Sequence, residues 1–172
     1  MTTRKSNGRI ASEVRSVEET AKIEKSFRKR DEKVLVRKVS HVGIVVKDIY
    51  QAMAAFDSFF RFVKDVHIEE IPEQGVKVAV LPLEGIELEF IQPIQPGTGV
   101  AKFLEKRGEG LHHISFEVDD IQETIKNVGA KGGTLINREP WQGVRGRTAF
   151  VHPSSLNGVL VELDQPSPKT GD

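Results

Sequence analysis

Four side chains of the types that bind divalent cations stand at matched positions along the chain. His41 and His113 each open a short apolar segment, and Glu89 and Glu162 each lie in the middle of a later one. Neutral imidazoles and carboxylates are nitrogen and oxygen ligands for divalent metal ions. If the fold brings these four side chains together, they form a metal site.

The matched positions arise from an internal repeat. The segment Gly158 to Pro166 repeats the pattern of Gly85 to Pro93: a glycine, apolar positions around a central Glu, and a closing Gln-Pro. The segment His41 to Ile49 lines up with His113 to Ile121 at almost the same offset, 72 residues against 73. One module has therefore been used twice, and the repeat supplies two imidazoles and two carboxylates at symmetry-related positions.

Each module has the pattern of one strand, one helix and then three strands. Apolar and polar side chains alternate after each His, which predicts strands with one apolar face. That face is predicted to hold Val42, Ile44 and Val46 in the first module and Ile114, Phe116 and Val118 in the second. The other face holds His41 and His113, whereas His112 falls on the apolar side and is not expected at the site. Asp48 and Asp120 have the positions of helix N-caps.

We therefore predict an α+β fold, in which two tandem βαβββ modules form a curved mixed sheet around one metal-containing cavity. The domain spans residues 34–166, with module one at 34–98 and module two at 110–166. A short helix is predicted from Gly99 to Lys106, between the modules. In module two the segment Glu139 to Gly146 is predicted to be a loop.

A divalent cation would explain why carboxylates point into a shared cavity. A buried, unpaired carboxylate is costly, and two that face each other are worse unless a cation neutralises them. The ligand types permit Co, Mn, Zn, Ni or Fe. The chain has no Cys, which excludes a thiolate site, and the oxygen-rich set favours open positions for water or substrate over a closed structural zinc site.

Composition narrows the class of protein further. The 172 residues include 25 Lys plus Arg and 25 Asp plus Glu, so the formal net charge is zero and gives no general attraction to nucleic acid or anionic membranes. No apolar run approaches the roughly 18 residues of a membrane span. We expect a cytoplasmic homodimer without nucleic-acid or membrane partners. Residues 1–33 form a charged extension with a helix from about 10 to 30, and residues 167–172 form a tail.

Several motifs between Val36 and Gln165 resemble the methylmalonyl-CoA epimerase family of the vicinal oxygen chelate (glyoxalase/bleomycin resistance/dioxygenase) superfamily. They are Ser40 to Ile44, Pro72 to Val76, Leu88 to Pro93, Ala101 to Lys106, Gly108 to Ile114, and His152-Pro153 followed by Gly158 to Leu163. The strand motifs are typical of the whole superfamily. Glu-Gln-Gly-Val and Gly-Glu-Gly-Leu-His-His are closer to the epimerases.

This resemblance implies an isomerase that interconverts the (R) and (S) forms of methylmalonyl-CoA by 1,1-proton transfer through a metal-stabilised enolate. It implies that His41, Glu89, His113 and Glu162 hold one divalent metal (Co, Mn, Zn or Ni, with cobalt favoured). Glu162 is the candidate for one acid/base group. Several bacterial members carry a second Glu where this chain has Val78. Gln74 as a positioning group, Glu89, or a water are the alternatives for the other role.

An acyl-CoA substrate brings phosphates, which the basic side chains of Lys102, Lys106, Arg107, Arg145 and Arg147 could meet. Three other functions are compatible with a related fold. A lactoylglutathione lyase (glyoxalase I) uses a similar ligand set, a metal-dependent dioxygenase should need only two His and one Glu, and a non-enzymatic small-molecule-binding protein would need none of the four ligands. Metal content and substrate-dependent uptake of solvent deuterium separate these alternatives.

Overall fold

The structure, a computed structural model, describes residues 16–28, 36–61, 66–143 and 145–168. Contacts divide the chain into two compact units, Met1–Glu32 and Lys33–Asp172. The first contains α1 (Val17–Arg28), inside the segment where a helix is predicted, while residues 10–15, 29 and 30 of that segment lie outside the described residues. Within the described part of the chain, no helix is long and apolar enough to cross a membrane.

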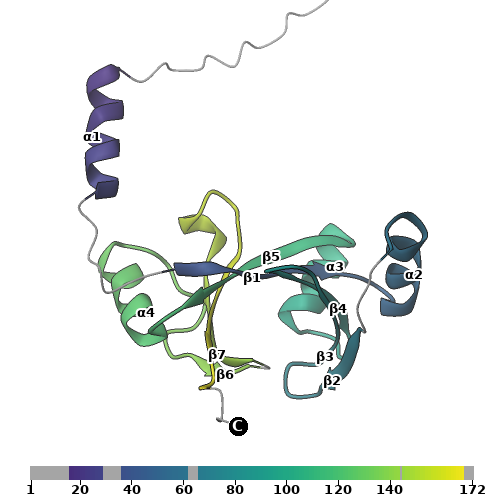
Figure 1. Cartoon of the computed structure of the whole chain (residues 1–172). Helices are drawn as coiled ribbons and strands as arrows, with labels where there is room; N and C mark the ends of the chain where they lie inside the picture. The colour runs from purple at the N-terminus through teal and green to yellow at the C-terminus, as the bar shows by residue number, and fades with distance from the viewer. Residues whose placement is uncertain (1–15, 29–35, 62–65, 144, 169–172) are drawn as a thin grey trace, which may run out of the picture. The chain divides into compact units, whose positions relative to one another are not determined.

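The second unit is built on an eight-stranded sheet with the strand order β2-β3-β4-β1-β5-β8-β7-β6 (Figure 1). The strands are β1 (Val36–Val45), β2 (His67–Ile71), β3 (Val76–Pro82), β4 (Glu87–Pro93), β5 (Gly110–Val118), β6 (Trp141–Gln142), β7 (Gly146–Val151) and β8 (Val161–Pro166). Strands β1 and β4 are parallel, as are β5 and β8, and the other neighbours are antiparallel. The mixed, curved sheet confirms the predicted fold class.

The two modules meet where β1 and β5 pair in the middle of the sheet. Module one contributes β2-β3-β4-β1 and module two contributes β5-β8-β7-β6, so the strand order of one half mirrors that of the other. The prediction of a loop from Glu139 to Gly146 is wrong for three residues, because β6 lies inside it and Gly146 is the first residue of β7. The segment from Thr134 to Ile136 forms an isolated β-bridge, in which Leu135 pairs with Val151 of β7.

The helix of each module begins at an Asp side chain in the matching position. The carboxylate of Asp48 accepts from the backbone N–H of Gln51 at the start of α2 (Ile49–Phe59), and Asp120 accepts from Glu123 at the start of α4 (Ile121–Ala130). These caps satisfy N–H groups that lack a partner inside the helix, as predicted.

The repeated Gln-Pro motif serves the same two helix ends. The side-chain oxygen of Gln92 accepts from the N–H of Ile49 at 3.0 Å, and that of Gln165 accepts from Ile121 at 3.1 Å. Each Gln therefore ties the last strand of its module to the first residue of the module's helix. This explains why the motif recurs with the repeat.

Apolar residues pack on both faces of the sheet. Helix α2 covers a cluster around Phe90 and α4 covers a cluster around Leu163, on the apolar face that the alternation predicts. Helix α3 (Gly99–Arg107), which confirms the predicted short helix, packs instead against Val45, Val78 and Ile91. Since Val45 lies on the same face of β1 as His41, this third cluster forms an apolar wall on the side of the sheet that carries the site residues.

Candidate metal centre

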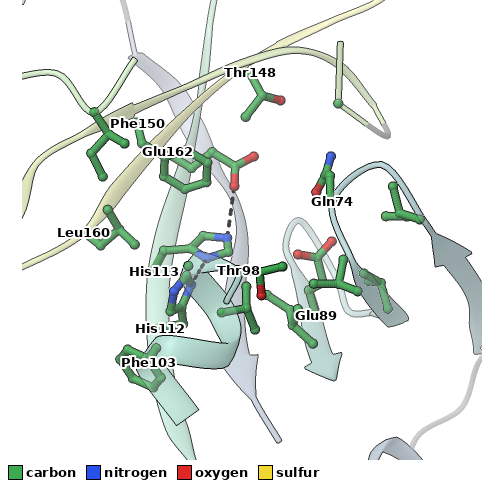
Figure 2. Close-up of a pocket in the computed structure, with 18 of the residues that line it drawn as sticks. Gln74, Glu89, Thr98, Phe103, His112, His113, Thr148, Phe150, Leu160 and Glu162 are labelled. Carbon is green, nitrogen blue, oxygen red and sulfur yellow. Dashed lines mark hydrogen bonds and ion pairs between the residues drawn. The ribbon is translucent and has the colours of Figure 1, made fainter. Parts of the chain in front are cut away.

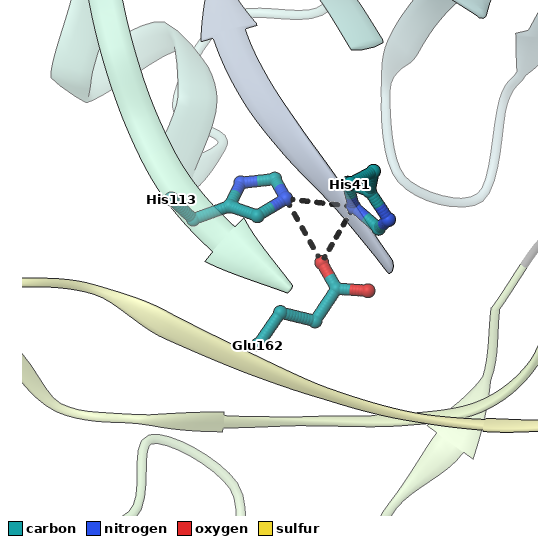
Figure 3. Close-up of side chains that lie close together, drawn as sticks. All are labelled: His41, His113 and Glu162. Atoms are coloured by element: carbon teal, nitrogen blue, oxygen red, sulfur yellow. Dashed lines mark hydrogen bonds and ion pairs between the residues drawn. The ribbon is translucent and has the colours of Figure 1, made fainter. Parts of the chain in front are cut away.

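Three of the four predicted ligands lie together in the buried middle of the sheet (Figure 3). The Nε2 atoms of His41 and His113 are 3.0 Å apart. Oε2 of Glu162 lies 3.1 Å from His113 Nε2 and 3.6 Å from His41 Nε2. The exposed fractions of the three residues are 1%, 5% and 8%. The donor atoms of all three lie within 4.8 Å of one another.

The strand register brings the two imidazoles together and leaves room for them. Across the β1–β5 pair, His41 lies opposite Ser115, and His113 lies opposite Gly43. Each His therefore faces the small residue that follows the other His by two positions. A Cβ atom on Gly43 would lie 2.3 Å from Cε1 of His113. The glycine is thus required by the ring of His113, which sequence reasoning did not identify.

Glu89 reaches the edge of this group. It is 8% exposed, and its Oε2 lies 3.6 Å from Nε2 of His41. Its other oxygen, Oε1, lies 3.4 Å from Nη1 of Arg145, which also forms an ion pair with Glu87. Glu89 is not among the three residues whose donor atoms are mutually close. The fourth ligand therefore remains a prediction.

His112 lines the cavity, which corrects the expectation that it faces away. Its Nδ1 lies 2.9 Å from Nδ1 of His113. The reason is a bulge in β5: Gly43 pairs with His113 and Ile44 pairs with Leu111, so His112 is an extra residue in the ladder. A bulge breaks the alternation of faces. Burial and the neighbouring His113 lower the pKa of His112 to about 4, so its imidazole is neutral near pH 7.

The same irregularity occurs in the other module. Val39 pairs with Phe116 and His41 pairs with Ser115, so Ser40 is the extra residue on β1. Ser40 precedes His41 as His112 precedes His113. Both predicted ligand imidazoles therefore follow a bulged residue, which re-aims the side chains next to it.

The electrostatics of the group favour a charged carboxylate between two imidazoles. Burial acts against the charged forms of both His41 and Glu162. The hydrogen bond and the carboxylate charges around His41 outweigh this and raise its pKa. Hydrogen bonds to His113 and His41 likewise outweigh burial at Glu162 and lower its pKa to about 2. Glu162 is therefore ionised at neutral pH, as a carboxylate ligand must be.

Two further polar groups beside Glu162 have no hydrogen-bond partner among the described residues. Ser115 is fully buried, and Asp164 is 2% exposed with both carboxylate oxygens unpaired. Burial and the charge of Glu162 raise the pKa of Asp164 to about 6. An unpaired buried carboxylate is costly, so Asp164 adds negative charge that a nearby cation would compensate.

This donor set fits a divalent cation. Two imidazole nitrogens and a carboxylate oxygen converge from three strands, all are buried, and further carboxylates lie beside them. Without a cation, converging lone pairs and carboxylates repel one another. Nitrogen and oxygen donors of this kind suit Co, Mn, Zn or Ni, and the geometry of three side chains does not select one of them.

The three side chains line a cavity of about 1270 Å³, and Figure 2 shows His113 and Glu162 in its lining. Gln74, in the turn between β2 and β3, also lines it, as does Glu89. Lys102, Lys106 and Arg107 of α3 add positive charge to its lining, and Arg145 contributes from the segment between β6 and β7. Arg147 is exposed and does not line the cavity. The cavity therefore combines a buried polar centre with a basic side.

Comparisons with known proteins agree with this architecture. The sequence profile of the Glyoxalase/Bleomycin resistance protein/Dioxygenase superfamily matches residues 40–152. The uncharacterised protein YqjC of Bacillus subtilis is 36% identical over 132 residues, which cover 76% of this chain and 94% of that protein. The ethylmalonyl-CoA/methylmalonyl-CoA epimerase of Cereibacter sphaeroides is 35% identical over 136 residues, which cover 76% of this chain and 99% of that one.

A solved structure is similar at the same level. It is a variant of the Streptomyces coelicolor methylmalonyl-CoA epimerase in complex with 2-nitronate-propionyl-CoA, with a TM-score of 0.71 and 31% sequence identity. The similarity covers 78% of this chain and 100% of that one.

Proposed function

The chain belongs to the Glyoxalase/Bleomycin resistance protein/Dioxygenase superfamily, and we propose that it is a metal-dependent epimerase that interconverts the (R) and (S) forms of methylmalonyl-CoA. The observation that carries the proposal is the convergence of His41, His113 and Glu162 in one large cavity. Relatives named as epimerases support the choice of substrate class.

In this proposal His41, His113 and Glu162, with Glu89 as the fourth ligand, hold one divalent ion. The family resemblance favours cobalt. When bound, such an ion supplies a Lewis acid for the thioester carbonyl. The buried position of the three side chains excludes bulk water, which strengthens every electrostatic interaction at the centre.

Glu162 is the proposed base for the proton on the carbon between the thioester and the carboxylate. Glu162 is ionised at neutral pH, and as a ligand of the ion it would have to loosen from the metal to take this proton. Inversion also requires return of a proton to the opposite face of the carbon. An amide does not titrate, so Gln74 has the role of positioning the substrate or the water that completes the transfer.

The rest of the cavity provides binding surfaces of two kinds. The wall formed by Val78, Ile91 and Phe103 is apolar and suits the methyl branch and the thioester arm. Lys102 and Lys106, on the exposed side of α3, suit the phosphates of coenzyme A. We expect the protein to act as a homodimer, which sedimentation of the purified chain would test.

The experiment that tests this function is isotope exchange. Cobalt-loaded protein is incubated with methylmalonyl-CoA in deuterium oxide, and the mass of the substrate is followed with and without a chelator. We expect deuterium to enter the substrate only with the metal present. A folded, cobalt-loaded protein that leaves the substrate unlabelled but consumes the glutathione hemithioacetal would instead be a lactoylglutathione lyase.

A further inference from the structure

Arg145 connects module two to the predicted ligands of module one. Its Nη1 lies 2.9 Å from Nδ1 of His41 and 3.4 Å from Oε1 of Glu89, and its Nη2 forms an ion pair with Glu87. The side chain is 22% exposed. The guanidinium is therefore held by three groups of the neighbouring module, two of which are predicted metal ligands.

The contact with His41 fixes the roles of its two ring nitrogens. A guanidinium has five N–H donors and no acceptor, so Nδ1 of His41 must accept the hydrogen bond from Arg145. The hydrogen of the neutral ring then lies on Nε2. Coordination of a cation through Nε2 needs the opposite tautomer, with the hydrogen on Nδ1. Two N–H donors would then face each other at 2.9 Å.

His113 has no such conflict. Its Nδ1 faces Nδ1 of His112, an imidazole and not a guanidinium, at 2.9 Å. A neutral imidazole can accept at this nitrogen. His113 can thus donate from Nδ1 to His112 once a cation replaces the contact between its Nε2 and Glu162. The two imidazoles therefore differ in the group that contacts Nδ1: His112 for His113 and Arg145 for His41.

We propose that Arg145 and the divalent cation compete for His41 and Glu89. Binding of the cation detaches the guanidinium of Arg145. The released guanidinium then pairs with the carboxylate of a malonyl thioester. Electrostatics favour this replacement of Arg145 by the ion. The ion brings two positive charges to the carboxylates where Arg145 brings one, and it repels the guanidinium. The released guanidinium is a fork of donors that matches a carboxylate in two-point geometry.

The second half of this inference rests on the proposed function and deepens it. A malonyl thioester carries a carboxylate, whereas a simple acyl thioester does not. A guanidinium in the cavity therefore distinguishes the two classes of substrate. In this role Arg145 is a specificity-determining residue, and the cation controls when it is available.

The test begins with cation affinity, which requires no substrate. Trp141 is the single Trp of the chain, lines the cavity, and its ring lies 5.7 Å from that of Phe150, which is itself 5.7 Å from the ring of His113. Quenching of its fluorescence by Co²⁺ reports binding, and calorimetry checks the affinity. We expect Arg145→Gln to bind Co²⁺ on the order of tenfold more tightly than the wild type, since a charge-assisted hydrogen bond no longer competes.

Arg147→Gln is the matched control, because it removes the same charge from an exposed position on β7. It should leave cation affinity unchanged. Arg145→Lys keeps the charge and loses the fork of donors, so its affinity should lie between those of the wild type and Arg145→Gln. Circular dichroism establishes that each variant is folded. Equal or weaker Co²⁺ binding by both Arg145 variants would overturn the competition.

The second measurement compares ligands on the cobalt-loaded protein. The wild type should bind malonyl-CoA in preference to propionyl-CoA, and Arg145→Gln should lose that preference while Arg147→Gln keeps it. A preserved preference in Arg145→Gln would contradict its role in carboxylate recognition. Failure of the proposed function would have a different signature, namely no deuterium exchange by the wild type, whatever the cation titrations give.

Discussion

The two modules share their frame but differ on the face that lines the cavity. Val45 and Ile91 of module one are apolar and pack under α3, while the matching positions of module two hold Glu117 and Asp164. The helix caps, the Gln side chains that tie strand to helix, and the bulges before each His are the same in both halves. Duplication has thus kept what builds the sheet and varied what surrounds the site.

The variation continues behind the two imidazoles. His113 has the neutral imidazole of His112 behind it, and His41 has the guanidinium of Arg145. The bulged position next to each ligand explains part of this difference: it holds a His in module two and Ser40 in module one. In the proposed metal centre, His113 can bind the ion while it keeps its contact with His112, whereas His41 must first lose its contact with Arg145.

Removal of either central imidazole is expected to have the largest effect. His41→Ala and His113→Ala should each reduce deuterium exchange into methylmalonyl-CoA by roughly a thousandfold, because a Lewis acid contributes several kcal/mol to stabilisation of developing charge. Mass spectrometry of the labelled substrate gives the rates. An exchange rate within tenfold of the wild type in either variant would mean that one half of the duplicated site suffices.

A methyl group added at one of two matched positions should disrupt the site although no predicted ligand is replaced. Gly43→Ala places a Cβ 2.3 Å from Cε1 of His113, so the ring must move, and we expect Co²⁺ affinity to fall by roughly a hundredfold, as for loss of a group that orients a ligand.

Ser115→Ala is the counterpart in the other module, where a hydroxyl without a partner is removed from a fully buried site. Its affinity should stay close to that of the wild type. Calorimetry measures both variants. Equal losses of Co²⁺ affinity in the two variants would show that a clash with the ring of His113 is not the reason for the small residue at position 43.

Replacement of His112, which contacts Nδ1 of His113, should have an intermediate effect on Co²⁺ affinity. His112→Phe keeps a ring against Phe103, whose centroid lies 4.9 Å from that of His112, but removes the acceptor for Nδ1 of His113. Groups that orient a metal-bound His typically contribute 10- to 100-fold to affinity, so we expect about tenfold weaker Co²⁺ binding. Unchanged affinity would indicate that His113 needs no partner for its outer nitrogen.

The last prediction concerns the stability of the protein and its dependence on pH. Burial and Glu162 raise the pKa of Asp164 to about 6, from 3.8. A folded state with the higher pKa binds a proton more readily than the unfolded chain, so the buried charge costs stability above pH 6, and the cost disappears as the pH falls toward 4. Asp164→Asn should therefore stabilise chelator-treated protein at pH 7.5 by about 3 kcal/mol or less.

Urea denaturation at pH 7.5 and pH 4.5 measures this difference. The stabilisation should be present at the higher pH and largely lost at the lower one. Asp48→Asn, at the half-buried N-cap of α2, is the control for a general charge effect. A stabilisation that does not change with pH would show that the buried charge of Asp164 is not its cause.

Much of the fold could be predicted because the repeat marks it twice. The spacing of the two His and two Glu, the alternation of apolar residues and the Asp caps are local patterns, and the structure contains the elements they predict. Residues reached across the sheet were harder. His112 follows no alternation because it sits in a bulge, and Arg145 lies more than a hundred positions from His41 along the chain.

The chain contains small signals for His112 and for the fit of the two rings, but none for Arg145. A second His directly before the ligand, with Ser40 at the matching place, differs between otherwise similar modules. A small residue two positions after each ligand, Gly43 and Ser115, marks where the opposite ring must fit. Pairing of the repeated strands with each other, which no local pattern specifies, is what gives these positions their meaning.

The most direct test of the central claim is the cobalt content of the protein and its variants after dialysis. We predict one Co²⁺ for each wild-type chain and essentially none for His41→Ala, His113→Ala or Glu162→Ala, with circular dichroism spectra like that of the wild type. Retention of cobalt by all three folded variants, or no binding by the wild type, would contradict a metal centre shared by the two modules.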